Sequence, residues 1–303
     1  MKKYRCLFLI TFLFMSCKDD PKEVHIDKEE SYTSSQKLSS VRADLNISVL
    51  IDLSDRISPE KYPNPTMNYY ERDIGYINSI VEAFETHLVN KKYIKLNDYI
   101  QLYLDPEPAD KSLNAKVNSL KIGITKDNAT KERIHSISNL YDSITTQIYE
   151  AAIRDNKFIG SDTWRFFKSK VNDYCIKSGY RNILIVLTDG YVFHKNTKYE
   201  DQNQTTYLIP QLIRSNKLTG SNWEELMKEK NFGLIPANQN LDELDVLVLG
   251  INPHNNSPFE EDVITAYWQN WLEQMGVNHA EVKGADLPSN MNSIVSKFIW
   301  NEN

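Results

Sequence analysis

Asn46-Ile-Ser-Val-Leu-Ile-Asp52 and Arg181-Asn-Ile-Leu-Ile-Val-Leu-Thr-Asp-Gly190 are the two stretches that decide the fold of this chain of 303 residues. Each begins as a nearly continuous apolar run and ends in a carboxylate. Such runs are typical of strands that are buried on both faces. A third run of this character covers residues 245–250. Three such runs predict a central, mostly parallel sheet.

Apolar residues at helical spacing separate these runs, for example over 74–88 and 134–152. Strand-like segments follow at 99–104 and 279–282, and weak alternation over 113–124 predicts an edge strand. The alternation of strands and helices predicts an α/β fold, with a doubly wound, mostly parallel central sheet and helices on both faces. Ligands of such sheets bind outside the carboxyl ends of the strands.

The first 16 residues have the pattern of a secretory signal, because three cations precede an apolar run at 6–15. This run is shorter than the roughly 20 residues that a membrane-spanning helix needs. Phe14-Met-Ser-Cys17 resembles a bacterial lipobox, which implies lipidation of Cys17 and a membrane anchor. Lys18-Asp-Asp20 resembles the export tag of Bacteroides-phylum lipoproteins and implies the outer membrane, with the periplasmic or cell-surface face left open.

Residues 17–45 are charged and rich in Ser and Thr, which predicts a flexible tether, and residues 46–303 are predicted to form one large domain. Two long connections, 56–73 and 191–242, leave the carboxyl ends of central strands. Connections of such length are usually functional or disordered. We therefore expect aromatic side chains of these connections to bind a partner. The candidates are Tyr62, Tyr69, Tyr70, Tyr191 and Phe193.

The composition excludes several classes of function. A net charge of −6 without a long basic cluster argues against a nucleic-acid or anionic-lipid partner. The six histidines and three cysteines show no metal-binding spacing, so a histidine or thiolate metal site is not expected. Cys175 shares a helical face with apolar residues, and we interpret it as a buried small hydrophobic residue.

Three short motifs follow one another at strand ends and at a helix start. They are Asp52-Leu-Ser-Asp-Arg56, Gly160-Ser-Asp-Thr-Trp164 and Thr188-Asp-Gly190. In this order they resemble the three loops that form the metal-ion-dependent adhesion site of von Willebrand factor A domains. The resemblance covers about 250 residues and implies binding of Mg²⁺, or Mn²⁺, with one coordination position left for an acidic group of a partner. The ligands that it implies are Asp52, Ser54, Thr163 and Asp189.

Arg56 departs from this family pattern, because it stands where the family has a second serine. An arginine cannot coordinate a cation. Two alternatives follow. Either the side chain points into solvent and leaves a weakened metal site, or its guanidinium pairs with Asp52 and Asp189 and replaces the metal.

The sequence therefore favours a non-enzymatic, membrane-anchored protein that binds a protein or glycan partner through the strand-end site. One alternative is a structural or assembly component of an envelope complex with a metal-free site, which Arg56 favours. A phosphohydrolase is less favoured, because haloacid dehalogenase enzymes need D-x-D after the first strand and Ser54 occupies the second acidic position.

Overall fold

A computed structural model of the chain describes residues 43–158, 160–253 and 257–301. These residues belong to one compact unit. The predicted signal peptide, Cys17 and most of the predicted tether lie outside the described residues. None of the helices described is both long and apolar enough to span a membrane.

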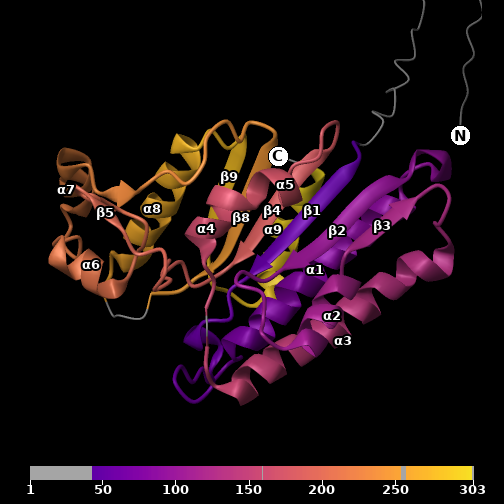
Figure 1. Cartoon of the computed structure of the whole chain (residues 1–303), viewed down its shortest axis with the longest axis horizontal. Coiled ribbons are helices and arrows are strands. Elements are labelled where there is room, and N and C mark those ends of the chain that lie inside the picture. The colour runs from indigo at the N-terminus through magenta and orange to yellow at the C-terminus, as the bar shows by residue number, and fades with distance from the viewer. Residues whose placement is uncertain (1–42, 159, 254–256, 302–303) are drawn as a thin grey trace, which may run out of the picture. The chain divides into compact units, whose positions relative to one another are not determined.

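The main sheet confirms the predicted fold class (Figure 1). Its six strands have the order β3-β2-β1-β4-β8-β9, and all neighbours are parallel except the antiparallel pair β2 and β3. The helices that connect parallel strands of this kind bury both faces of the central strands. The strands are β1 (Leu45–Ile51), β2 (Asn97–Tyr103), β3 (Ile122–Thr125), β4 (Arg181–Leu187), β8 (Leu244–Ile251) and β9 (His279–Gly284).

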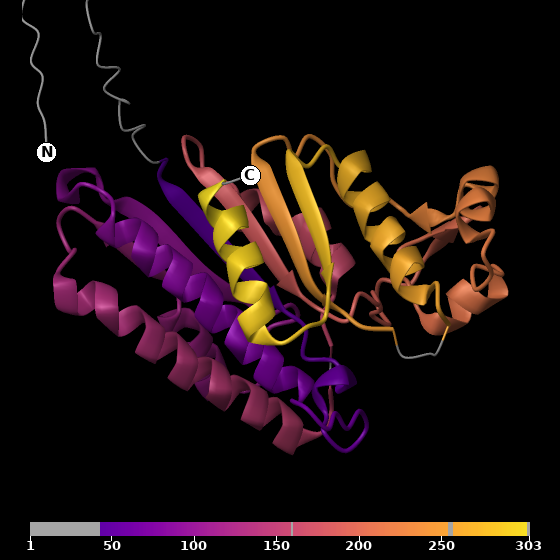
Figure 2. The ribbon, with the colours of Figure 1, turned by 180° about the vertical axis from the view of Figure 1, so that it is seen from behind.

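Helices cover both faces of this sheet, as predicted (Figures 1 and 2). Alternate residues of β1 point to opposite sides, so Ile47 and Val49 join one hydrophobic cluster and Leu50 joins the other. The first cluster is covered by α1 (Tyr69–Val89), α2 (Lys111–Ser119), α3 (Lys131–Asp155) and α9 (Pro288–Trp300). The second is covered by α4 (Thr163–Ser169), α5 (Val171–Cys175) and α8 (Glu260–Gln274), and it contains the buried, free Cys175.

The predicted edge strand over 113–124 was wrong in its first half. Residues Lys111–Ser119 form α2, and only Ile122–Thr125 form the edge strand β3. The Asp110 carboxylate caps α2 by accepting hydrogen bonds from the backbone N–H groups of Ser112 and Leu113. The spacing of four between the buried Leu113 and Val117 suits a helix rather than a strand.

The connection over 191–242 contains more regular structure than its sequence indicated. A second sheet of three short strands has the order β5-β6-β7 and is accompanied by two helices. These elements are β5 (Glu200–Asp201), β6 (Gln204–Thr205), α6 (Pro210–Ser215), α7 (Trp223–Lys230) and β7 (Gly233–Leu234). Short 3₁₀ helices also occur, η1 (Asp55–Ile57) after β1 and η2 (Tyr93–Lys95) before β2.

Gly190, at the exit of β4, is the position where the fold most plainly requires glycine. Its φ of 95° lies in the left-handed region, and a Cβ there would collide with Ile264 and lie 2.7 Å from Ile251 Cδ1. Gly179 has a similar φ of 82°, but nothing lies within 4 Å of a Cβ built on it. Alanine substitutions at the two positions therefore distinguish the cost of backbone strain from the cost of steric overlap.

We expect Gly179→Ala to lower the free energy of unfolding by about 1 kcal/mol, which is the cost of a left-handed conformation. Gly190→Ala should cost about 1–3 kcal/mol more, because a methyl group must be forced into a packed core. Urea denaturation of both variants measures the difference. Equal losses of stability would contradict the close packing around Gly190.

Candidate functional site

The centre of the main sheet forms a crevice at the carboxyl ends of β1 and β4. These two strands are neighbours over their full length, Leu45 beside Arg181 to Ile51 beside Leu187. From β1 the chain continues to β2 on one side, and from β4 it continues to β8 on the other. The loops after β1 and β4 therefore diverge, and this switch point is the usual ligand site of a doubly wound sheet.

The first loop follows β1 and folds around the carboxylate of Asp52. The backbone N–H of Asp52 donates to the carbonyl of Leu187, 3.0 Å away, and so continues the strand pairing. Ser54 then donates twice to this carboxylate, from its backbone N–H to Oδ1 at 2.9 Å and from its hydroxyl to Oδ2 at 3.0 Å. The two predicted ligands Asp52 and Ser54 are thus oriented by each other.

The second loop approaches the first through Gly160. A Cβ on Gly160, whose φ is 78°, would lie 3.7 Å from Ser54 Cβ and 4.0 Å from Asp52 Oδ1. Thr163 is buried at the start of α4, where its hydroxyl donates to Ser161 Oγ at 3.3 Å. Ser161, and not Thr163, lines the cavity at the strand ends.

The third loop follows β4 and brings Asp189 to the same place. Asp189 Oδ1 accepts a hydrogen bond from the backbone N–H of Tyr191 at 3.0 Å. The pKa of Asp52 is raised to about 6: burial raises it most, Arg56 lowers it, the charge of Asp189 raises it, and the hydrogen bonds from Ser54 lower it. A cation bound beside Asp52 would favour its ionised form.

Part of the predicted aromatic surface joins these loops around one cavity of about 610 Å³. Tyr62, Tyr191 and Phe193 line it together with Asp52, Ser54, Ser161 and Asp189. Tyr69 and Tyr70 do not line it, because they form the first turn of α1, where the ring of Tyr70 packs 6.5 Å from that of Tyr149. Basic side chains that the sequence analysis did not single out complete the wall, namely Lys61, Lys157, His194 and Lys195.

Arg56 follows the second alternative in part, because it is buried and forms an ion pair with Asp52, but the carboxylate nearest to it is that of Asp73. Its side chain is only 4% exposed, and Nη2 lies 2.6 Å from Oδ2 of Asp73 in α1. Nη2 also donates to the carbonyls of Asp52 and Leu187, at 3.3 and 3.2 Å, whereas Nε stays 3.8 Å from Asp52 Oδ2. Burial lowers the pKa of Arg56, but the carboxylates of Asp73 and Asp52 outweigh it and raise the pKa above its ordinary value. The guanidinium therefore remains charged beneath the cavity.

Asp73 is a further residue that the sequence did not reveal. It is buried on α1, where Tyr149 of α3 also donates its hydroxyl to Oδ2 at 2.8 Å. A single acidic residue in an amphipathic helix carries no distinguishing pattern, so only the packing of α1 and α3 against η1 identifies the partner of Arg56.

The donor set of the cavity fits a small, hard cation. Asp52 and Asp189 line the cavity, whereas Asp73, which lies nearest to the guanidinium of Arg56, does not. Carboxylate and hydroxyl oxygens are ligands that Mg²⁺ prefers, and it commonly keeps several waters. Within the described ranges, no group of three or more His, Cys, Asp or Glu side chains is placed to hold a metal. Hydroxyls of Ser54 and Ser161 would have to complete such a site.

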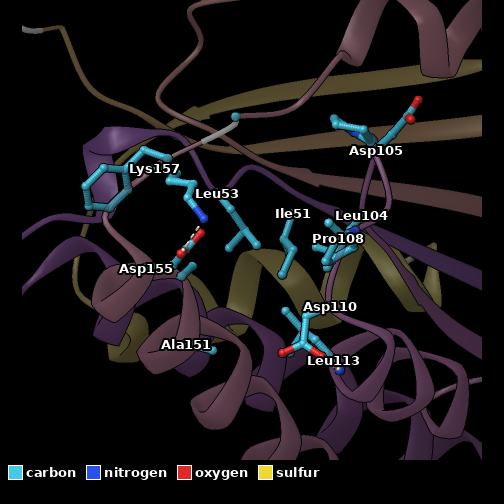
Figure 3. A pocket seen from close by; sticks show the side chains of 15 residues that line it. Ile51, Leu53, Leu104, Asp105, Pro108, Asp110, Leu113, Ala151, Asp155 and Lys157 are labelled. Atoms are coloured by element: carbon cyan, nitrogen blue, oxygen red, sulfur yellow. Dashed lines mark hydrogen bonds and ion pairs between the residues drawn. The ribbon is translucent and has the colours of Figure 1, made fainter.

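A second, mainly apolar cavity of about 360 Å³ adjoins the first, and Lys157, Phe158 and Gly160 line both. Figure 3 shows Ile51 and Leu53 between the loop that carries Pro108 and the helix that carries Ala151. Lys157 pairs with Asp155 at 2.9 Å beside this cavity.

The main sheet has one antiparallel edge strand, and residues of all three loops line one cavity at the switch point. This arrangement is von Willebrand factor A-like. In this A-like domain the first and third loops provide the carboxylates, and the second loop provides the hydroxyl of Ser161.

Comparisons with known proteins add little to this description. The chain matches no protein-family model and no curated protein. It is similar in structure to an aerotolerance-related membrane protein from Bacteroides fragilis, with 10% identity, a TM-score of 0.35, and coverage of 85% of this chain and 98% of that one. It is also similar to the pilus adhesin SpaC from Lactobacillus rhamnosus, with 13% identity and a TM-score of 0.36. That match covers 86% of this chain and 30% of the adhesin. At these scores neither structure bears on the function of the chain.

We expect the Arg56 and Asp73 pair to behave as one energetic unit. Arg56→Met or Asp73→Asn alone should lower the free energy of unfolding by about 3–5 kcal/mol, because each leaves an uncompensated buried charge. The double variant should cost less than the sum by up to about 3 kcal/mol, and Tyr149 can still donate to the amide oxygen of Asn. Urea denaturation of all four proteins measures the coupling. Additive losses would contradict the pairing.

Proposed function

We propose that this chain is a membrane-anchored binding protein of the cell envelope, and that it captures an acidic group of a protein or glycan partner through a cation at the switch point. The observation that carries this proposal is the meeting of Asp52, Asp189 and two serine hydroxyls in one cavity between diverging loops. A cation held there with an open coordination position would bind a carboxylate of the partner directly.

The residues of the A-like domain have distinct parts in this proposal. Asp52 and Asp189 would supply the charge, while Ser54 and Ser161 would supply neutral oxygen ligands. Thr163 would act through its hydrogen bond to Ser161, 3.3 Å away. Mg²⁺ or Mn²⁺ would supply the positive charge that draws an acidic group into the cavity.

A protein partner is favoured over a glycan by the adjoining apolar cavity. It shares Lys157, Phe158 and Gly160 with the cavity that holds Asp52 and Asp189, so a single ligand could contact both. The rim aromatics Tyr62, Tyr191 and Phe193 are of the kind enriched in protein interfaces. An acidic residue beside a bulky apolar one would suit both cavities.

The proposed location follows from the N-terminal sequence. Lipidation of Cys17 would hold the chain at the outer membrane, on either its periplasmic or its cell-surface face, and residues 18–42 would act as a tether. Tethering raises the effective concentration of the site for partners near the membrane.

A second candidate, an assembly component with a metal-free site, is favoured by the position of Arg56. Its guanidinium lies below the cavity, 3.8 Å from Asp52, and would repel a cation bound to that carboxylate. In this case partner binding would depend on Asp189 but not on a metal.

Isothermal titration of Mg²⁺ and Mn²⁺ into the chain from Lys18 onward tests the first candidate. We expect saturable binding, and a loss of affinity of about tenfold or more in Asp189→Asn, because a charged ligand is removed. Asp127→Asn is the matched control, since this exposed aspartate lies after β3, outside the cavity. Absence of binding in the wild type would overturn the metal-bridged proposal.

Two further measurements separate the candidates. Arg56→Ser combined with Asp73→Asn keeps the local charge and restores the serine of the family pattern, so Mg²⁺ should bind more tightly. Fluorescently labelled peptides with Asp-Leu or Asn-Leu cores can then be compared with and without chelator. Binding that needs both Asp and the metal supports the first candidate, and binding insensitive to chelator supports the second.

A further inference from the structure

The edge of the main sheet opposite the cavity carries a second feature, an exposed apolar segment between α1 and β2. Here it is called the 89–96 loop. Among the described residues, seven large hydrophobic side chains are markedly exposed, and three of them belong to this short loop. Val89 is 59% exposed, Tyr93 56% and Ile94 72%. Such a concentration of apolar side chains in solvent marks an interaction surface more than an isolated exposed residue would.

This exposure is imposed by the fold, because the loop is held at both ends. Lys91 is buried and pairs with Asp44 at 2.5 Å and with Asp98 at 2.8 Å. Leu96 is buried, and its carbonyl accepts from the backbone N–H of Lys126 at 3.0 Å. Between these anchors, the 3₁₀ helix η2 directs the side chains of Tyr93 and Ile94 outward.

Positive charge surrounds the apolar side chains. Lys92 and Lys95 are exposed within the loop, and Lys126 lies beside it through its hydrogen bond to Leu96. Five basic side chains are exposed in the loop, in the β3–α3 turn and at the start of α3, namely Lys92, Lys95, Lys126, Lys131 and Arg133. Two acidic side chains are exposed in the same segments, Asp127 and Glu132. The net charge of −6 argued against an anionic-lipid partner, but this edge of the domain is locally basic. Basic side chains around an aromatic and aliphatic tip are complementary to an anionic lipid surface.

The loop lies where the described chain enters the domain. Asp44, the partner of Lys91, directly precedes β1, so the loop and the start of β1 share one edge of the sheet. In Figure 2, β1 begins at the upper edge and α1 runs back to end at the same edge. The seven residues of β1 span roughly 23 Å, and the candidate site lies at their far end.

We propose that the 89–96 loop rests on the surface of an anionic phospholipid bilayer. Tyr93 would lie at the headgroup level, Ile94 would insert beside it, and Lys92 and Lys95 would contact lipid phosphates. The cavity at the other end of β1 then faces away from the membrane and toward a partner. The proposal is independent of the cation site, and the proposed lipid anchor would strengthen a contact that is weak by itself.

Co-sedimentation of the chain from Lys18 onward with vesicles tests the proposal without the anchor. The described residues form one compact unit with its own core on both faces of the sheet, so this chain is a suitable probe. We expect binding to vesicles of 70% phosphatidylcholine and 30% phosphatidylglycerol, weakening as salt rises. Lys92→Gln with Lys95→Gln should lower the partition coefficient by about tenfold or more.

Tyr93→Ser with Ile94→Ser should lower partitioning by about tenfold, because the inserted apolar area is lost. Tyr199→Ser is the matched control, since Tyr199 is 60% exposed in the 191–242 segment, and it should bind as the wild type does. The proposal is overturned if the wild type does not bind anionic vesicles, or if all variants bind equally. It is also overturned if light scattering shows a dimer that Ile94→Ser converts to a monomer, because the loop would then join two copies.

Discussion

The pairing of β1 with β4 is the constraint on which the rest of the structure depends. Both strands are buried on both faces, so their seven-residue register cannot shift without exposing apolar side chains or misaligning the ladder. This register places Asp52 and Asp189 at equivalent strand ends. The connections that leave in opposite directions then open the crevice in which both carboxylates lie. The chemistry of the site is thus a consequence of sheet topology.

Arg56 shows how this fold accommodates a departure from the family pattern. The guanidinium donates to the carbonyls of Asp52 and Leu187 and pairs with Asp73, which ties the first loop to α1. A buried arginine of this kind is tolerated because its charge is paired with carboxylates and most of its donors are matched. The same interaction keeps the guanidinium beneath the cavity, where it moderates the acidity of the site without filling it.

The two ends of the sheet have contrasting surfaces. At the carboxyl ends, acidic groups are buried among aromatic side chains in a cavity. At the amino ends, apolar side chains and lysines of the 89–96 loop are displayed outward on a firmly held turn. Parallel strands make this polarity inherent, because all their beginnings lie on one edge and all their ends on the other. The tether that we propose before β1 would thereby leave the site on the side away from the membrane.

The sequence by itself determined the α/β class, the central strands and the three loops, because apolar runs and strand-end carboxylates are local patterns with a direct physical meaning. It also indicated Tyr62, Tyr191 and Phe193 at the cavity, since they follow the ends of central strands. Only the tertiary structure decided that Ser161 faces the cavity in place of Thr163, that Tyr69 and Tyr70 belong to α1, and that Arg56 pairs with Asp73. These outcomes depend on packing between segments distant in the chain, where side-chain direction and the need to neutralise a buried charge override any local signal.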